Sequence, residues 1–307
     1  MSDLIIIGVD HGYAAMKTAH FSFPTGLVEY EHEPYTQKDV LEYGGKYYVV
    51  GSARQPLQRD KTATEDYYLL TLAAIAKELD YRGMERTAEV LLAAGLPLTS
   101  FGRDKKKFRD YLLRGGKPVC FRYEGRDYTV HLADVMLFPQ GYAAVLTQTE
   151  LLDEPSVIVA DIGGWTVDLM RLDNRIPNAA TCRSLELGMI RCLDEISEKA
   201  RQMFGVSMTD VQIESILRGG AVSVDDRIRA VIHTQAGQYV QDLLSAIMES
   251  GLDVRAMPAI FLGGGAALLK RHASALEGPC RPLILDDVCL NAKGYERCLL
   301  YTSPSPR

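Results

Sequence analysis

The stretch VDHGYAAMKT, residues 9–18, follows the apolar run LIIIG and brings Asp10, Gly12 and Lys17 close together in the chain. An apolar run, a glycine turn and a second short run are typical of a β-hairpin, so we expect strands over 4–10 and about 14–23. Such a turn can simply connect two strands, or it can hold the phosphates of a nucleotide. Taken alone, a D-x-G pattern favours the simple turn, because it often arises by chance.

The stretch VIVADIGGWTVDLMRLDN, residues 157–174, repeats this plan in the second half of the chain. Each copy has an apolar strand that ends in Asp, then x-Gly, then a second strand. Two copies of one unit in two halves indicate an internally duplicated architecture. The second copy reverses the preference, so both turns are interpreted as phosphate loops.

The predicted chemistry of these loops follows from where their acids lie. Asp10 and Asp161 would each end a buried strand, at the sheet edge where ligands collect in α/β folds. The glycine that follows lets backbone N–H groups approach anionic oxygens. Carboxylates repel phosphates unless a divalent cation lies between, so the two acids predict Mg²⁺ held through water. Lys17 would supply a positive charge for the phosphates, and the second half of the clamp would consist of Gly163, Gly164 and Thr166.

A third element, AIFLGGGAALLK at residues 259–270, places three glycines between an apolar strand and the start of a helix. Glycine loses the most backbone entropy on folding, so three in a row need a reason. We expect this backbone to pass close to a flat ligand such as adenine and ribose, with the helix N-terminus facing the phosphates. The alternative is a tight connection between strand and helix, for which a single glycine would serve.

Composition limits the possible partners. The 307 residues are 47% hydrophobic and 24% charged, which excludes disorder over most of the chain. The net charge of −6 argues against direct binding of nucleic acid, which depends on Lys and Arg neutralising phosphates. The six cysteines are scattered, so we expect free thiols in a reducing, cytoplasmic setting. No run of about 18 apolar residues predicts a membrane helix, and the short apolar N-terminus indicates a strand rather than a signal peptide.

A polar segment with a proline, TELLDEPS at residues 149–156, separates the two halves, and we expect the lobe boundary there. The predicted first lobe covers residues 1–154 and includes a small inserted subdomain at about 30–95. The predicted second lobe covers residues 155–297 and returns toward the first lobe at its end. Residues 298–307 run into a Ser/Pro tail that we treat as suspect and non-native.

In this order, the three glycine-containing loops resemble the nucleotide site of the superfamily of actin, sugar kinases and heat-shock chaperone ATPases. VDHGYAAMK is similar to its first phosphate loop, ADIGGWTVDL to the second and FLGGGAALL to the adenosine loop. Within the superfamily the chain most resembles the plasmid-segregation actins of the ParM/StbA type, on the D-x-G-x-x-x-x-K spacing, the segment VLLAAGLPLTSFGRDKKKFRDYL and the motif NAKGY. The resemblance implies a two-lobed α/β fold, each lobe with a duplicated mixed-sheet core, around a cleft that binds ATP (or GTP) and Mg²⁺.

The resemblance also assigns roles to residues. The implied catalytic residues are Gln140, which would orient the attacking water, Asp161 as the water or metal partner and Asp10 as the metal-side carboxylate. His11 receives no role, and Asp168 is expected to face solvent or to pair across the sheet. Trp165 stands where the family commonly has a small or hydroxyl residue. The implied nucleotide contacts are Gly12, Tyr13, Lys17, Gly163, Gly164, Trp165, Thr166, Gly188, Glu214, Arg218, Gly263, Gly264, Gly265 and Ala266.

The implied function is a Mg²⁺-dependent ATPase that polymerises head to tail into actin-like filaments and moves plasmid DNA. DNA would be reached through a separate adaptor of the ParR type, in keeping with the acidic charge, with no direct nucleic-acid or membrane partner. Two alternatives stay open. One is a kinase for a sugar or small acid, which needs a catalytic carboxylate facing its substrate. The other is a scaffold or chaperone ATPase that does not polymerise.

Overall fold

The computed structural model describes residues 4–52, 58–146, 150–272 and 282–302. Contacts divide the chain into two units, one of Met1–Thr147 with Val288–Arg307 and one of Gln148–Asp287. The chain therefore returns to the first unit at Val288, within the range that we expected to belong to the second lobe. Each unit contains one mixed sheet, so the predicted α/β class is confirmed.

Nine described strands build the sheet of the first unit: β1 (Ile5–His11), β2 (Ala15–Thr18), β3 (Ser22–Pro24), β4 (Leu27–Tyr30), β5 (Val40–Tyr43), β6 (Lys46–Val50), β7 (Thr87–Leu96), β8 (Val119–Tyr123) and β9 (Arg126–Pro139). Their order is β3-β2-β1-β7-β9-β8-β5-β6-β4. β1, β7 and β9 run parallel, and β1 pairs with β2 in the predicted antiparallel hairpin. The second predicted strand, about 14–23, is divided into β2 and β3. β7 lies beside β1, inside the range expected to form an inserted subdomain.

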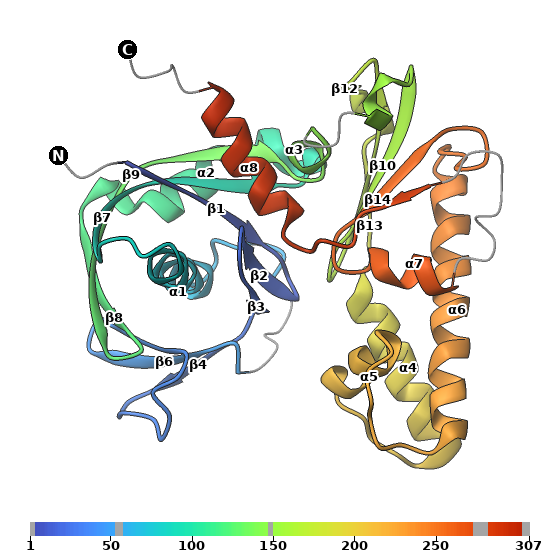
Figure 1. Ribbon diagram of the computed structural model, residues 1–307, viewed down its shortest axis with the longest axis horizontal. Helices are drawn as coiled ribbons and strands as arrows, with labels where there is room; N and C mark the ends of the chain where they lie inside the picture. The colour runs from blue at the N-terminus through green and yellow to red at the C-terminus, as the bar shows by residue number, and fades with distance from the viewer. Residues whose placement is uncertain (1–3, 53–57, 147–149, 273–281, 303–307) are drawn as a thin grey trace. The chain divides into compact units, whose positions relative to one another are not determined.

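The helices of the first unit are α1 (Asp66–Tyr81), α2 (Leu98–Leu113), the 3₁₀ turn η1 (Arg114–Gly116), α3 (Tyr142–Val145) and α8 (Leu290–Thr302). The sheet curls around α1, which lies inside it (Figure 1). The apolar stripe of this helix, from Leu69 to Leu79, is buried. α2 carries three consecutive lysines, and it ends where Arg114 and Gly115 adopt left-handed backbone angles.

α8 packs tightly on the first unit. A Cβ at Gly8 of β1 would overlap the carbonyl of Ala292, and one at Gly95 of β7 would overlap the ring of Tyr295. These glycines are needed because the backbones approach so closely. The helix continues to Thr302, through residues that we expected to begin a non-native tail, while residues 303–307 lie outside the described part.

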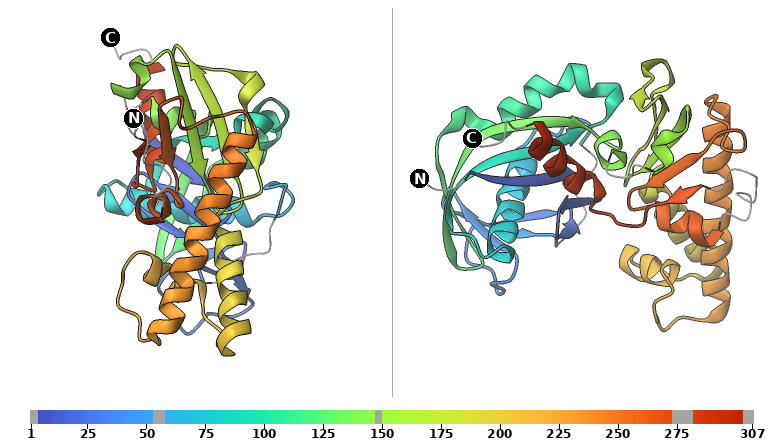
Figure 2. Two further views of the ribbon diagram at one scale, coloured as in Figure 1. Left: turned by 90° about the vertical axis from the view of Figure 1, so that its right-hand side faces the viewer. Right: turned by 45° about the horizontal axis from the view of Figure 1, so that its top comes forward.

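The second unit has six described strands, β10 (Ser156–Ile162), β11 (Val167–Asp173), β12 (Ile176–Pro177), β13 (Arg183–Leu185), β14 (Ala259–Leu262) and β15 (Leu283–Ile284). Its helices are α4 (Met189–Phe204), α5 (Asp210–Leu217), α6 (Asp226–Glu249) and α7 (Ala266–His272), with 3₁₀ turns η2 (Glu150–Asp153) and η3 (Ala179–Thr181). α6 lies alongside α4 (Figure 2). The sheet order is β12-β11-β10-β14-β15, with β13 on β11.

The duplication expected from the sequence is visible in how the two sheets begin. β1 pairs antiparallel with β2 and parallel with β7, and β10 pairs antiparallel with β11 and parallel with β14. In each unit the hairpin turn therefore stands next to the end of a parallel strand. This common frame places the two D-x-G turns in equivalent positions of the two sheets.

Candidate functional site

In the first unit, Asp10 lies at the end of β1 and is fully buried. The hairpin register places it directly opposite Lys17, whose Nζ lies 3.2 Å from Asp10 Oδ2. Gln140, just after the end of β9, donates from Nε2 to Asp10 Oδ1 at 2.8 Å. Two predicted site residues, Lys17 from the same hairpin and Gln140 from just after the end of β9, are thus brought to the carboxylate of a third. The roles of all three remain predictions.

The turn after Asp10 depends on its glycine. A Cβ at Gly12 would collide with the carbonyl oxygen of Ala15, so only glycine fits at this position. Thr25 Oγ1 donates to the Gly12 carbonyl at 2.7 Å and fixes the turn from the side. Tyr13, the next residue, has its ring 4.9 Å from Lys61 Nζ. The turn is therefore a braced loop rather than an open one.

His11, which had no predicted role, is buried between helices. Its Nε2 lies 2.9 Å from Thr71 Oγ1 of α1, and its ring meets Phe108 of α2 edge-on at 5.1 Å. Burial, and next the positive charge of Lys61, lower the pKa of His11 to about 3. The imidazole is therefore neutral at physiological pH. It contacts α1 and α2 and so holds the loop against these helices, and it does not act as an acid or base.

In the second unit, the turn that contains Gly163 is held against the start of α4. Gly163 donates to the Thr166 carbonyl, and Gly188 donates to the carbonyl of Trp165. The carbonyls of Gly163 and Gly164 accept from the first two amides of α4. A Cβ at Gly188 would collide with the backbone of Gly164. The loop closes in spite of Trp165, because that residue takes part through its main chain.

Asp161 is the penultimate residue of β10, and the register places it directly opposite Asp168 of β11. Their exposed fractions are only 4% and 8%. Asp168 accepts from Ser184 Oγ of β13 and, at 3.4 Å, from Thr166 Oγ1. Of the two positions expected for Asp168, the structure shows the pairing across the sheet. Like charges directly opposite each other on paired strands are destabilising unless they are compensated.

The three glycines have different surroundings. At Gly263 the φ angle is +88°, and a Cβ would lie 2.5 Å from Asp161 Oδ1. A Cβ at Gly265 would collide with Ile162, and only Gly264 has nothing within 4 Å of such an atom. Packing within this unit thus accounts for two of the three glycines, a reason that we had not given. Ala266, which begins α7, is fully buried.

Glu214 and Arg218 lie at the end of α5 and form an exposed ion pair of 3.2 Å with each other. Arg271 of α7 donates to the carbonyl of Arg218 at 2.7 Å, which links this corner to the helix after the three glycines. The main chain at Arg218 thus contacts α7, the helix that follows the three glycines, and the roles of the two side chains remain predictions.

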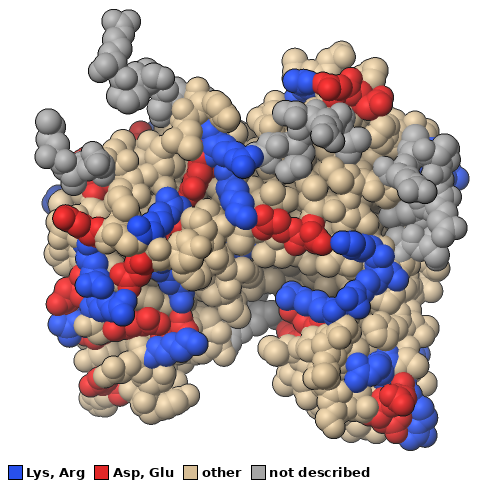
Figure 3. Space-filling view, in the orientation of Figure 1, with Lys and Arg blue, Asp and Glu red and all other residues tan. Residues whose placement is uncertain are grey.

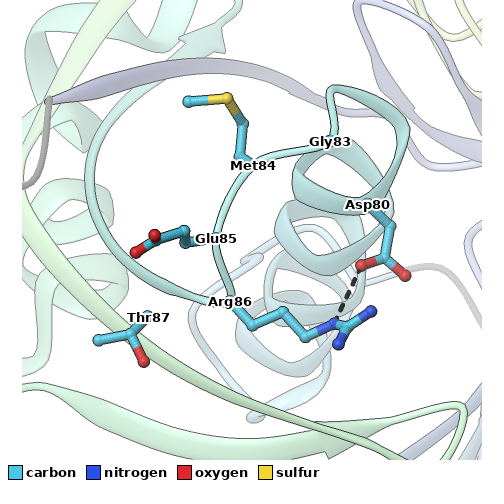
Figure 4. A pocket seen from close by; sticks show the side chains of 6 residues that line it. All are labelled: Asp80, Gly83, Met84, Glu85, Arg86 and Thr87. Carbon is cyan, nitrogen blue, oxygen red and sulfur yellow. Dashed lines mark hydrogen bonds and ion pairs between the residues drawn. The ribbon is translucent and has the colours of Figure 1, made fainter.

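A hollow on the first unit lies away from these residues. It has a volume of about 480 Å³ and lies on the turn after α1, where Arg86 Nε approaches Asp80 Oδ1 at 3.3 Å (Figure 4). None of the predicted site residues lines it. In the described part of the chain, no helix has the length and apolar composition needed to cross a membrane.

Sequence reasoning missed two residues that hold the first loop and β1. Lys61 belongs to no motif, and its contact with the loop depends on a fold that joins distant segments. Glu296 of α8 accepts hydrogen bonds from the Gly8 amide at 2.8 Å and from Arg82 at 2.6 Å. No sequence pattern near Glu296 predicts these contacts.

Comparisons with known proteins bear on the family and fold of the chain. The family described as "Actin like proteins N terminal domain" matches residues 8–142, and the family "Archaeal actin homologue MreB-like, C-terminal" matches residues 159–275. No curated protein sequence matches the chain. Among solved structures, the archaeal actin homologue Ta0583 is similar with a TM-score of 0.74 and 18% identity, covering 98% of this chain and 100% of that one.

Two ParM structures are similar over comparable lengths. The ParM of a 15-stranded filament from Clostridium botulinum has a TM-score of 0.76 and 18% identity, covering 97% of this chain and 99% of that one. Bacillus thuringiensis ParM with ATP has a TM-score of 0.71 and 16% identity, with the same coverage of 97% and 99%. At these identities the structures establish the fold, and the two family matches follow one another along the chain. The chain belongs to the actin-like proteins, with an actin-like N-terminal domain followed by an MreB-like C-terminal domain.

Proposed function

We propose that this chain is a nucleotide-dependent ATPase that assembles into actin-like filaments. The observation that carries the proposal is the strand–Asp–x–Gly–strand arrangement, which occurs in both units. In each of them the carboxyl group of the Asp is buried. Further support comes from two similar proteins, because Bacillus thuringiensis ParM was solved with ATP and Ta0583 with ADP. The nucleotide would be ATP or GTP, bound jointly by the two phosphate loops.

Mg²⁺ fits the donors that the chain offers. Asp10 and Asp161 present hard carboxylate oxygens, the ligands that Mg²⁺ prefers. Among the described residues, no group of three or more His, Cys, Asp or Glu side chains gathers to hold a metal. A cation with so few protein ligands keeps most of its waters, as Mg²⁺ does when it accompanies phosphates. When bound, it would neutralise phosphate charge during phosphoryl transfer.

The residues of the chain then divide the remaining work. Lys17 adds positive charge for the phosphates, and backbone N–H groups of the turns at Gly12 and Gly163 bind anionic oxygens. Gln140 Nε2 already donates a hydrogen bond to Asp10. Its amide oxygen would therefore be the atom that accepts a hydrogen bond from the attacking water. Because an amide is a poor base, it orients the water, and charge stabilisation supplies most of the rate. Gly188, the three glycines from Gly263, Glu214 and Arg218 would receive the nucleoside.

Filament assembly would use head-to-tail contacts, which generate open polymers when the rotation does not close. Nucleotide state would control assembly if the ATP and ADP forms differ in affinity for the lattice. For plasmid segregation we propose a basic adaptor of the ParR type. The net charge is −6, and positive and negative side chains alternate over the face shown in Figure 3, which leaves no broad basic surface there for DNA.

The proposal is tested by pelleting and light scattering of the purified protein with Mg²⁺ and ATP or GTP, alongside phosphate release. We expect polymer that forms with triphosphate and dissolves after hydrolysis. Failure to polymerise at micromolar protein under several salt conditions would reject the filament. Phosphate that is transferred to a sugar or small acid, rather than released, would favour the kinase alternative.

A further inference from the structure

A second lysine lies against the first phosphate loop. Lys61 comes from the segment between β6 and α1, about fifty positions from the loop, and only 8% of its surface is exposed. Its Nζ donates a hydrogen bond to the backbone carbonyl of His11. The same ammonium lies 4.9 Å from the ring centre of Tyr13 and 5.7 Å from that of Tyr67. It therefore contacts the residues on both sides of Gly12.

Burying an ammonium group is costly unless its charge is compensated. Part of the compensation comes from a carbonyl oxygen and from two aromatic faces, whose negative π-clouds attract cations. Two of these three partners belong to the loop itself. The loop conformation and the position of Lys61 are thus mutually dependent, and moving either one would leave a buried charge poorly solvated.

His11 completes the support under the loop. Its side chain is clamped between Thr71 of α1 and Phe108 of α2, while its carbonyl is held by Lys61. Side chain and main chain of one residue are fixed from different elements. The peptide that leads into Gly12 is consequently oriented before any ligand arrives, which reduces the ordering cost of binding.

We propose that Lys61 is a positioning residue for the first phosphate loop: it fixes the backbone from His11 to Tyr13 and places a second positive charge, beside that of Lys17, next to the triphosphate. This inference rests on the proposed nucleotide-binding function. The lysine acts on the phosphates and not on the base. Its removal should therefore weaken the binding of ATP much more than the binding of adenosine.

The test compares Lys61→Met, Lys61→Arg and, as a matched control, Lys106→Met on the exposed face of α2. Affinities for ATP and adenosine are measured by calorimetry, together with KM, kcat and the melting temperature without nucleotide. For Lys61→Met we expect about tenfold weaker ATP binding, a raised KM with kcat largely retained, and adenosine affinity within about twofold. Lys61→Arg, which keeps the charge and stacks on aromatic rings, should recover most of the loss.

Unchanged ATP affinity in a folded Lys61→Met protein would overturn the inference while leaving the ATPase proposal intact. Equal losses for ATP and adenosine would also overturn it, because they indicate a general structural defect. If the wild-type protein binds neither ligand, the proposed function itself fails.

A measurement on the wild-type protein covers the case in which Lys61→Met does not fold. ATP, but not adenosine, should slow hydrogen exchange in residues 58–65 together with residues 9–18, and should leave the turn at Glu124–Gly125 unchanged. Protection confined to residues 9–18 would contradict the coupling of Lys61 to the loop.

Discussion

The two phosphate loops share one frame but carry different charges. In the first, the strand-ending acid Asp10 stands opposite Lys17, and in the second the equivalent acid Asp161 stands opposite Asp168. Both partners lie seven positions after their acid. The first loop therefore contains a compensated ion pair, whereas the second concentrates two carboxylates at one place.

This difference in charge indicates that the two loops contribute differently to ligand binding. An acid paired with a lysine leaves a site whose charge is balanced and which tolerates phosphates close by. Two facing carboxylates repel each other and gain from a divalent cation or a proton. Under the proposed function, we expect the phosphates to depend mainly on the charge of the first loop and Mg²⁺ mainly on the acids of the second.

The largest expected effect is on hydrolysis. Asp161→Ala should lower kcat by about 10²–10³-fold, because the water or metal partner is lost while the loop glycines remain. The measurement is phosphate release under saturating Mg²⁺ and ATP, with melting temperature as the check on folding. The exposed acid Asp242 on α6 gives the control, and Asp242→Ala should hydrolyse at the wild-type rate. Unchanged turnover in Asp161→Ala would show that the second loop is misassigned.

A pair of charge variants tests the contrast itself. Lys17→Met leaves Asp10 as a buried carboxylate without its cation and should destabilise the nucleotide-free protein by about 3 kcal/mol. Asp168→Asn removes one of two facing carboxylates yet keeps an acceptor for Ser184, so its stability should equal or exceed that of the wild type.

Urea unfolding near pH 7 without nucleotide or metal compares these variants. Asp168→Asn should also need more Mg²⁺ for half-maximal hydrolysis. If Asp168→Asn lowers the free energy of unfolding as much as Lys17→Met does, Asp168 is not a repelling charge, and the proposed contrast between the two loops is wrong.

Gln140 donates to the acid of the first loop, and its variant extends the comparison to catalysis. Gln140→Ala should slow hydrolysis by about 10²-fold, because the attacking water is no longer oriented, and should leave ATP affinity nearly unchanged. Single-turnover rates and equilibrium binding separate the two quantities. A variant that loses binding and rate together would mean that Gln140 acts through Asp10 alone.

The smallest effect concerns the residue after each acid, His11 in the first loop and the fully buried Ile162 in the second. The pKa of His11 is lowered to about 3 by burial, so below pH ~6.5 protons bind the unfolded chain and not the folded one. Stability is therefore lost as pH falls, by about 2 kcal/mol from pH ~7 to pH ~5. His11→Leu, which imitates the apolar residue of the second loop, should lose about that much less over the same range, measured by urea unfolding at both pH values. An identical pH dependence in the variant would contradict a buried neutral histidine.

The sequence predicted the parts of this molecule that are local. The two D-x-G hairpins depend on residues close together in the chain. The pairing of Asp10 with Lys17 was within reach, because a hairpin of known turn length determines its register.

Long-range packing was not predictable in this way. Lys61 and Glu296 reach the first loop and β1 only because the fold joins distant segments. The three glycines from Gly263 were assigned to the ligand, but two of them are required by the neighbouring strand end. A single sequence shows that a position needs glycine and does not show which neighbour demands it.

The central claim is that nucleotide binding requires both phosphate loops, and calorimetric titration of the wild-type protein with Mg²⁺ and ATP tests it most directly. We predict a stoichiometry of one ATP per chain, lost entirely when either Gly12→Val or Gly163→Val blocks one loop. A stoichiometry of two, or full binding that survives the loss of either loop, would contradict this requirement.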